Sequence, residues 1–79
     1  MVDIDEVNSK LRLTFPSLEF IKIISDIDYS YYEIRFILVM KKRDKLGRRV
    51  ESKQRIIAYD TDAMYKEACK AARRFMNKD

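Results

Sequence analysis

Residues 31–42 carry the clearest periodic signal in the chain, and this pattern limits the possible folds more than any other feature. Successive side chains of a strand point to opposite faces of a sheet, so a period of two indicates a half-buried β-strand. The expected core face carries every second residue: Tyr32, Ile34, Phe36, Leu38 and Met40. The opposite face carries Glu33, Arg35 and Lys41, with Ile37 and Val39 between them.

Two more strands are expected, one on each side of this segment. Residues 18–27 are rich in β-branched and aromatic side chains, and residues 48–59 direct Val50, Ile56 and Ala58 toward the core. Between the second and third strands, Asp44 suits the start of a type I turn and Gly47 suits the positive φ that closes it. The three segments therefore predict an antiparallel β-meander.

A helix is expected at each end of the chain, over residues 3–15 and 61–77. The first has apolar residues at intervals of three and four, with Asp3 as a cap and Pro16 as a stop. The second is capped by Asp60 or Thr61 and has one broad apolar stripe, made by Met64, Ala68, Ala71, Ala72, Phe75 and Met76. The predicted fold class is α+β, in the order helix, three strands, helix, with both helices on one sheet face.

Length and composition set the remaining limits. The 79 residues suffice for a single small domain spanning 1–79, and one Gly and one Pro indicate dense regular structure. The longest apolar run, Ile34 to Met40, is far shorter than the roughly 20 residues of a membrane span. The single cysteine, Cys69, cannot form an internal disulfide and lies in the apolar stripe as an inert thiol. We expect an intracellular protein of a reducing cytoplasm, with no membrane contact.

Catalytic patterns are scarce, and we expect a protein without enzymatic activity, metal or cofactor. The chain has no histidine, no Gly-rich phosphate loop and no paired cysteines. One set of acidic residues could form a metal site. Asp26 and Asp28 precede the "EIR" of Glu33 and Arg35, an arrangement that resembles the Mg²⁺ site of a nuclease superfamily. A metal-dependent nuclease is therefore kept as a remote alternative.

The basic residues are concentrated in one segment. Residues 41–55 contain eight of the seventeen Lys and Arg residues, against the two acids Asp44 and Glu51. Clustered bases on an open sheet face can neutralise phosphates and reach base edges in a major groove. We predict that this face binds nucleic acid, and duplex DNA in preference to RNA. The predicted binding residues are Arg35, Lys41, Arg43, Lys45, Arg48, Arg49, Lys53 and Arg55.

Other partners would use the same surface or its borders. The main alternative is a small inhibitor or adaptor that binds an acidic protein, with Tyr29, Tyr31 and Tyr59 as possible contacts, whereas Tyr32 is expected in the core. The aliphatic side chains of Ile37, Val39 and Ile57 on the open face also permit a homodimer. Simple solubility and edge protection by the charges is the plainest interpretation.

The segment from Tyr31 onward, which contains "KKRDKLGRRV", "YDT" and an Ala-rich helix, resembles the small arm-binding domain at the N-terminus of phage and transposon tyrosine recombinases. In that family the sheet enters the major groove of DNA. The resemblance implies that the chain is an accessory or regulatory factor of a phage or mobile element. The residues that it would place at the DNA are Arg35, Lys41, Arg43, Arg49, Lys53 and Arg55.

The order of elements and the "KEACKAARRFM" of the last helix also look like a double-stranded RNA-binding domain. That family grips phosphates with lysines at the start of the last helix, where this chain has Asp60, Asp62 and Ala63, with Lys66 nearby. Acids at this position repel phosphate, so the second resemblance implies the layout of the fold rather than RNA binding.

Overall fold

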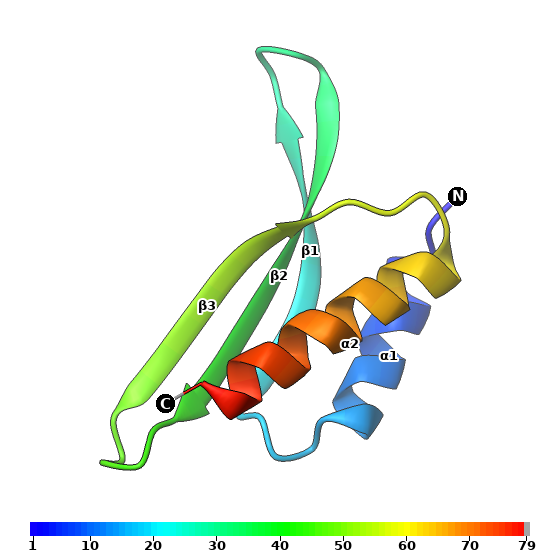
Figure 1. The fold of residues 1–79 in the computed structure, drawn as a ribbon. Coiled ribbons are helices and arrows are strands. Elements are labelled where there is room, and N and C mark those ends of the chain that lie inside the picture. Colours follow the sequence, from blue (N-terminus) through cyan, green and yellow to red (C-terminus); the bar gives the residue numbers. More distant parts are fainter. Residues whose placement is uncertain (79) are drawn as a thin grey trace.

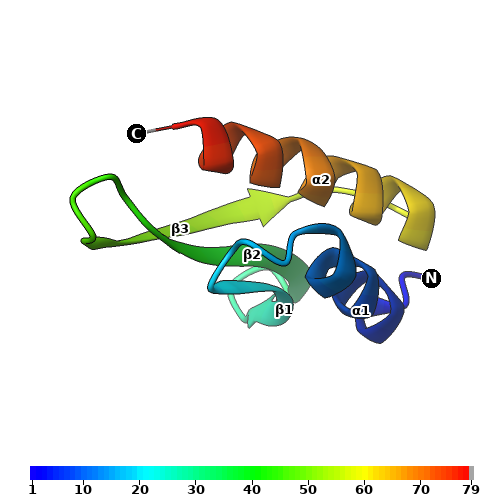
Figure 2. The ribbon, with the colours of Figure 1, turned by 90° about the horizontal axis from the view of Figure 1, so that it is seen from below.

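The computed structural model describes residues 1–78 and confirms the α+β class. The elements follow in the order α1 (Ile4–Thr14), β1 (Phe20–Asp28), β2 (Glu33–Arg43), β3 (Arg49–Ile56) and α2 (Thr61–Asn77). The strands form one antiparallel sheet in the order β1-β2-β3, as Figure 1 shows. After β3 the chain turns back, and α2 runs alongside β3 toward the β2–β3 hairpin (Figures 1 and 2).

The hydrophobic core lies on one face of the sheet. Alternate strand residues face it, among them Ile21 and Ile23 of β1, Leu38 and Met40 of β2, and Ile56 of β3. They form one cluster with buried side chains of both helices, namely Val7, Leu11, Met64, Ala68, Cys69, Ala71, Ala72 and Phe75. Both helices therefore pack on the same sheet face, as predicted, and the opposite face carries no covering element in the described residues (Figure 2).

The helix ends follow local capping chemistry. The Asp3 carboxylate accepts a hydrogen bond from the Glu6 N–H at 3.1 Å, and the Asp60 carboxylate accepts one from the Ala63 N–H at 2.7 Å. At the other end of α1 the helix stops at Thr14, two residues before Pro16, because proline disfavours helical geometry in the residue before it. Neither helix in residues 1–78 has the length and apolar character needed to cross a membrane.

Three details of the predicted core are wrong. Tyr32 is 88% exposed and lies in the β1–β2 turn with a φ of 50°, so it precedes β2 instead of starting it. Ile34 is 61% exposed because the β1–β2 hairpin projects beyond the helices, as Figure 1 shows. Met76 is 41% exposed near the end of α2, although its neighbour Phe75 is buried. The third strand is also shorter than predicted and ends at Ile56.

Asn8 is the one buried polar residue among the described positions. It lies on α1, and its side-chain amide bonds both backbone groups of Ile23 in β1. The Ile23 N–H donates to Asn8 Oδ1 at 2.7 Å, and Asn8 Nδ2 donates to the Ile23 carbonyl at 3.0 Å. β1 is an edge strand, so Asn8 occupies the place that a neighbouring strand would take.

Lys42 connects the sheet to the C-terminal end of α2. Its ammonium group donates hydrogen bonds to the carbonyl oxygens of Phe75 and Lys78 and lies 4.7 Å from the centre of the Phe75 ring. The last carbonyls of a helix lack partners within the helix and carry partial negative charge, so a cation is stabilising there. The sequence patterns predicted neither this role nor that of Asn8.

Candidate nucleic-acid interface

The sheet face opposite the helices, called the open face below, carries most of the predicted binding residues. The strand register arranges it in six rows across the sheet. From the β2–β3 hairpin toward the β1–β2 hairpin these rows are Arg43–Arg49, Phe20–Lys41–Glu51, Lys22–Val39–Lys53, Ile24–Ile37–Arg55, Asp26–Arg35 and Asp28–Glu33. The charges separate along this series, which gives the open face two different ends.

The basic end comprises the first three rows, the tip of the β2–β3 hairpin and Glu19, which directly precedes β1. It holds seven bases and three acids, a net charge of +4. The bases are Lys22, Lys41, Arg43, Lys45, Arg48, Arg49 and Lys53, and the acids are Glu19, Asp44 and Glu51. Six of the eight predicted binding residues therefore come together here.

The hairpin tip is held by Asp44 and Gly47. The Gly47 N–H donates to the Asp44 carbonyl at 3.0 Å, and Gly47 has a φ of 77°. This is a type I turn followed by a left-handed residue, which confirms the predicted roles of both positions. The Asp44 carboxylate accepts hydrogen bonds from the N–H groups of Leu46 and Arg48, both at 2.9 Å, and from the Arg48 side chain at 3.1 Å. The backbone hydrogen bond from Arg48 is the main cause that lowers the pKa of Asp44.

Arginine side chains beside the hairpin share one acid. Glu19 lies just before β1, and its carboxylate is 3.1 Å from Arg43 Nε and 3.6 Å from Arg49 Nη2. Both arginine side chains remain more than half exposed, at 56% and 58%. Glu19 thus orients two guanidinium groups on the surface while it neutralises part of their charge.

The lysines of the basic end lie around a buried valine. Val39 is only 8% exposed although it is on the open face, and its direct neighbours in the register are Lys22 and Lys53. Long lysine side chains cover apolar surface with their methylene groups and keep the ammonium in water, which explains the burial. Val39 therefore adds little apolar surface to the open face, and the homodimer stays a prediction. Lys41 lies over the ring of Phe20 at 5.1 Å from its centre.

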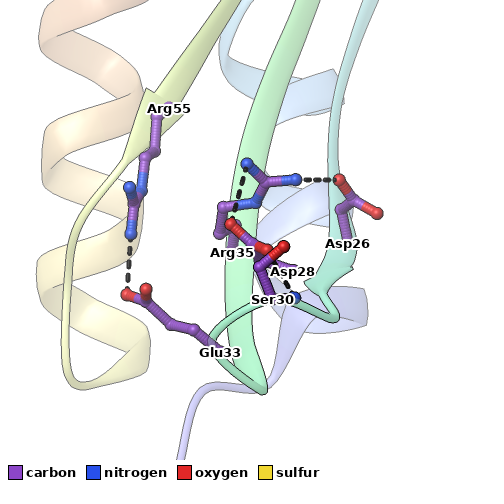
Figure 3. A network of polar contacts seen from close by, with 6 residues as sticks. All are labelled: Asp26, Asp28, Ser30, Glu33, Arg35 and Arg55. Carbon is purple, nitrogen blue, oxygen red and sulfur yellow. Dashed lines mark hydrogen bonds and ion pairs between the residues drawn. The ribbon is translucent and has the colours of Figure 1, made fainter.

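The acidic end of the open face comprises the last two rows together with Arg55, and carboxylates there take up the predicted arginines. Arg35 contacts Asp26 at 2.7 Å and Asp28 at 3.8 Å, as Figure 3 shows. Arg55 contacts Glu33 at 2.8 Å (Figure 3). Three acids against two bases give this end a net charge of −1. Arg35 and Arg55 thus lie apart from the basic end and have local counter-ions.

The same network bears on the nuclease alternative. In a metal site, Asp26, Asp28 and Glu33 would converge on one metal ion. Instead, Asp26 and Asp28 contact the guanidinium of Arg35, and Glu33 contacts Arg55 (Figure 3). In residues 1–78 no group of three or more His, Cys, Asp and Glu side chains is placed to hold a metal ion. Cys69 is buried, as predicted for an inert thiol.

The tyrosines are exposed but lie outside the basic end. Tyr29 and Tyr31 are 76% and 77% exposed in the turn between β1 and β2. Tyr59 is also exposed, on the connection from β3 to α2, because β3 ends before it. All three rings are thus accessible, and their role as partner contacts stays a prediction.

Two residues of the basic end were missed by sequence reasoning, Lys22 and Glu19. Both are far from the basic segment in sequence. Lys22 comes near Lys53 through the two registers of the sheet, and Glu19 comes near Arg43 through the pairing of β1 with β2. The start of α2 offers no comparable site, since Lys66 pairs with Asp62 at 3.0 Å. The hydrogen bond that the Lys66 ammonium donates to the Asp62 carboxylate is the main cause that raises the pKa of Lys66.

No protein-family model matches the chain, and neither a curated protein nor a solved structure matches it. The two family resemblances of the sequence thus stay predictions.

Proposed function

We propose that this chain binds nucleic acid, with a preference for duplex DNA, through the basic end of its open face. The observation that supports the proposal is the separation of charge along the sheet: seven bases gather around one exposed β-hairpin with three acids among them. A simple solubility role would leave bases and acids mixed along the whole face. The proposed contacts are Lys22, Lys41, Arg43, Lys45, Arg48, Arg49 and Lys53.

The shape of this end suits a major groove. Neighbouring strands lie about 4.8 Å apart, so a two-stranded hairpin fits the roughly 12 Å width of the groove in B-form DNA. Arg43 and Arg49 face each other across the hairpin, and each could reach a phosphate or a guanine edge on its own side. The major groove of A-form RNA is too narrow for such a ribbon, which is the reason for the preference.

The acids of the basic end do not oppose this function strongly. The ion pairs of Glu19 with Arg43 and Arg49, and that of Glu51 with Lys53, are exposed. Exposed ion pairs contribute only about 0–1 kcal/mol, so the cations can exchange a carboxylate for a phosphate at small cost. Arg35 and Arg55 are held in the acidic end, and the proposal assigns them a supporting role in the sheet.

The resemblance to arm-binding domains of tyrosine recombinases agrees with a sheet that enters the major groove. The corresponding proposal is an accessory or regulatory DNA-binding factor of a phage or mobile element, without enzymatic activity of its own. This part depends on the resemblance alone.

Fluorescence anisotropy with three labelled probes of one sequence tests the proposal: a duplex DNA, a single-stranded DNA and a duplex RNA of about two helical turns. We expect the duplex DNA to bind most tightly at about 50 mM salt. Changing Arg43, Arg49 and Lys53 together to alanine should weaken binding at least about tenfold, since each loses a charge-assisted contact. The matched control changes Lys66, Lys70 and Arg73 on exposed positions of α2, which removes the same charge and should keep affinity within about twofold. Equal losses in both triple variants, or no binding by the wild type, would overturn the proposal.

A further inference from the structure

The two outer edges of the sheet are treated differently by the fold. At the β1 edge, Asn8 satisfies both the N–H and the C=O of Ile23, and α1 covers the strand. A sheet edge with unpaired backbone groups is a template for another strand, and natural proteins cover or disrupt such edges. The β1 edge is thereby closed to further strands at Ile23.

The β3 edge is open. The β2–β3 hairpin closes on a hydrogen bond from the Asp44 N–H to the Arg48 carbonyl at 2.9 Å. Hydrogen-bonded pairs alternate along an antiparallel ladder, so Val50, Ser52, Gln54 and Ile56 bond β2. The backbone groups of the alternate residues, Glu51, Lys53 and Arg55, point away from the sheet. In the described part of the chain, no hydrogen bond reaches these groups from outside it.

A groove accompanies this open edge. It lies between β3 and the C-terminal half of α2, and its volume is about 510 Å³. Its apolar surface comes from Val50, Ala71 and Phe75, and polar side chains of Ser52 and Gln54 lie along the strand. Four bases, Lys42, Arg48, Arg74 and Lys78, line the groove against the two acids Asp44 and Glu51. The strand itself carries three bases and one acid.

We propose that the β3 edge binds an extended, acidic segment of a partner protein, which adds to the sheet as a fourth, antiparallel strand. Alternate side chains of such a segment would point to opposite sheet faces. Those on the open face would lie beside Arg49, Lys53 and Arg55 and are best acidic. Those on the other face would enter the groove beside Val50 and Phe75 and are best apolar. This site shares Arg48, Arg49 and Lys53 with the proposed DNA-binding surface, but it is defined by the open backbone edge of β3 and by the groove, so it does not depend on the DNA function.

Charge decides between this occupant and a second copy of the chain. Pairing two β3 strands would bring six bases and two acids into one narrow interface, because each β3 has Arg49, Lys53 and Arg55 against Glu51 alone. Like charges directly opposite each other destabilise a strand pair. An acidic segment removes this repulsion and adds charge complementarity to the backbone hydrogen bonds.

The test uses a capped ten-residue peptide of alternating Glu and Val, titrated into the full chain and followed by NMR. We expect saturable binding, with hydrogen exchange of the Glu51 and Lys53 amides slowed at least about tenfold, because these amides gain a partner. Glu51→Ala removes the one acid of β3 and should strengthen binding. Glu51→Pro removes the same charge but also the outward N–H and should weaken binding at least about tenfold. Equal affinities of the two variants would overturn the proposal.

N-methylated peptides keep the test decisive if Glu51→Pro does not fold. In the antiparallel addition proposed, the Glu residues of the peptide lie opposite outward-facing residues of β3 and direct their N–H groups at the strand. Methylating the Glu amides should abolish binding, whereas methylating the Val amides should leave affinity within about twofold. If both methylated peptides bind like the parent, no strand is added. If sedimentation shows a wild-type dimer that Glu51→Ala retains and Glu51→Pro loses, the edge belongs to a second copy, and the proposal is wrong.

Discussion

Replacing Asn8 by alanine tests how the fold closes one edge of its sheet. The side chain is 4% exposed and makes two hydrogen bonds, at 2.7 and 3.0 Å, to the backbone of Ile23. Alanine can make neither, so a donor and an acceptor of an edge strand would lie under α1 without partners. Each buried group left unsatisfied costs about 1–3 kcal/mol. We therefore expect Asn8→Ala to lower the free energy of unfolding by about 2–6 kcal/mol.

This loss is large for so small a domain. The total stability of a domain is about 5–15 kcal/mol, and 1 kcal/mol shifts the melting temperature of a domain this size by about 4–8 °C. Urea unfolding followed by circular dichroism measures the change. Asn77→Ala, at an exposed position of α2, is the matched control and should alter stability by at most about 0.5 kcal/mol. A cost below about 1 kcal/mol for Asn8→Ala would refute the assigned role.

Asn8→Asp separates the two hydrogen bonds. An aspartate keeps the shape of the side chain and still accepts from the Ile23 N–H, but when ionised it cannot donate to the Ile23 carbonyl. Burial raises the pKa of such a carboxyl group. The destabilisation should therefore be full at neutral pH and should shrink as the pH falls through the raised pKa and the acid regains a donor. A destabilisation that does not change between neutral and acidic pH would contradict this account.

Three further predictions concern the hairpin and the end of α2. Lys42→Met removes the ammonium group that bonds the Phe75 carbonyl, and should cost about 1–3 kcal/mol of stability by urea unfolding, whereas Lys70→Met should cost less than about 0.5. Gly47→Ala should cost about 1–2 kcal/mol through the left-handed backbone alone, because nothing lies within 4 Å of the added Cβ; no loss of stability would count against the turn. In an NMR titration, the carboxyl of Asp44 should show a pKa below 3.8. Because the pKa of Asp44 is lowered in the folded chain, its carboxylate stabilises the hairpin fully at pH values above the pKa of the unfolded chain. This stabilisation is lost as the pH falls through the pKa of the folded chain. Asp44→Asn should remove this pH dependence.

The order of elements could be predicted from sequence because each strand is buried on one face. That arrangement leaves a period of two in the apolar residues, which is clear at Phe36, Leu38 and Met40. The same pattern continues to Ile34, which is exposed, because the reach of the helices over the sheet is a tertiary property. Periodicity predicts which way a side chain points, and what covers it depends on other elements.

Two structurally important residues, Asn8 and Lys42, interrupt apolar patterns in the sequence, and the tertiary structure explains why. Asn8 is at a position of α1 between Val7 and Leu11, on the apolar side of the helix, and Lys42 takes the core-facing place that follows Met40 in β2. A polar residue in an apolar pattern indicates a specific partner, but the partner cannot be found from local sequence. Here the partners are the backbone of β1 and the end of α2.

The basic surface was predicted in part. The cluster around Gly47 is evident from composition, and its turn follows from Asp44 and Gly47. The separation into a basic and an acidic end depends on register, since Arg35 meets Asp26 and Arg43 meets Glu19 only across paired strands. A slip of one residue would send every side chain to the other face, so charge counts in sequence cannot replace the register.

The salt dependence of duplex DNA binding tests the central claim most directly. Each phosphate contact contributes about 0.9 to the slope of log affinity against log salt, so six or seven contacting bases predict a slope of about −5 to −6. Changing Arg43, Arg49 and Lys53 to alanine should reduce this slope by about 3 units, whereas the α2 control with Lys66, Lys70 and Arg73 changed should keep it. A slope near zero for the wild type, or the same slope in both triple variants, would contradict the account.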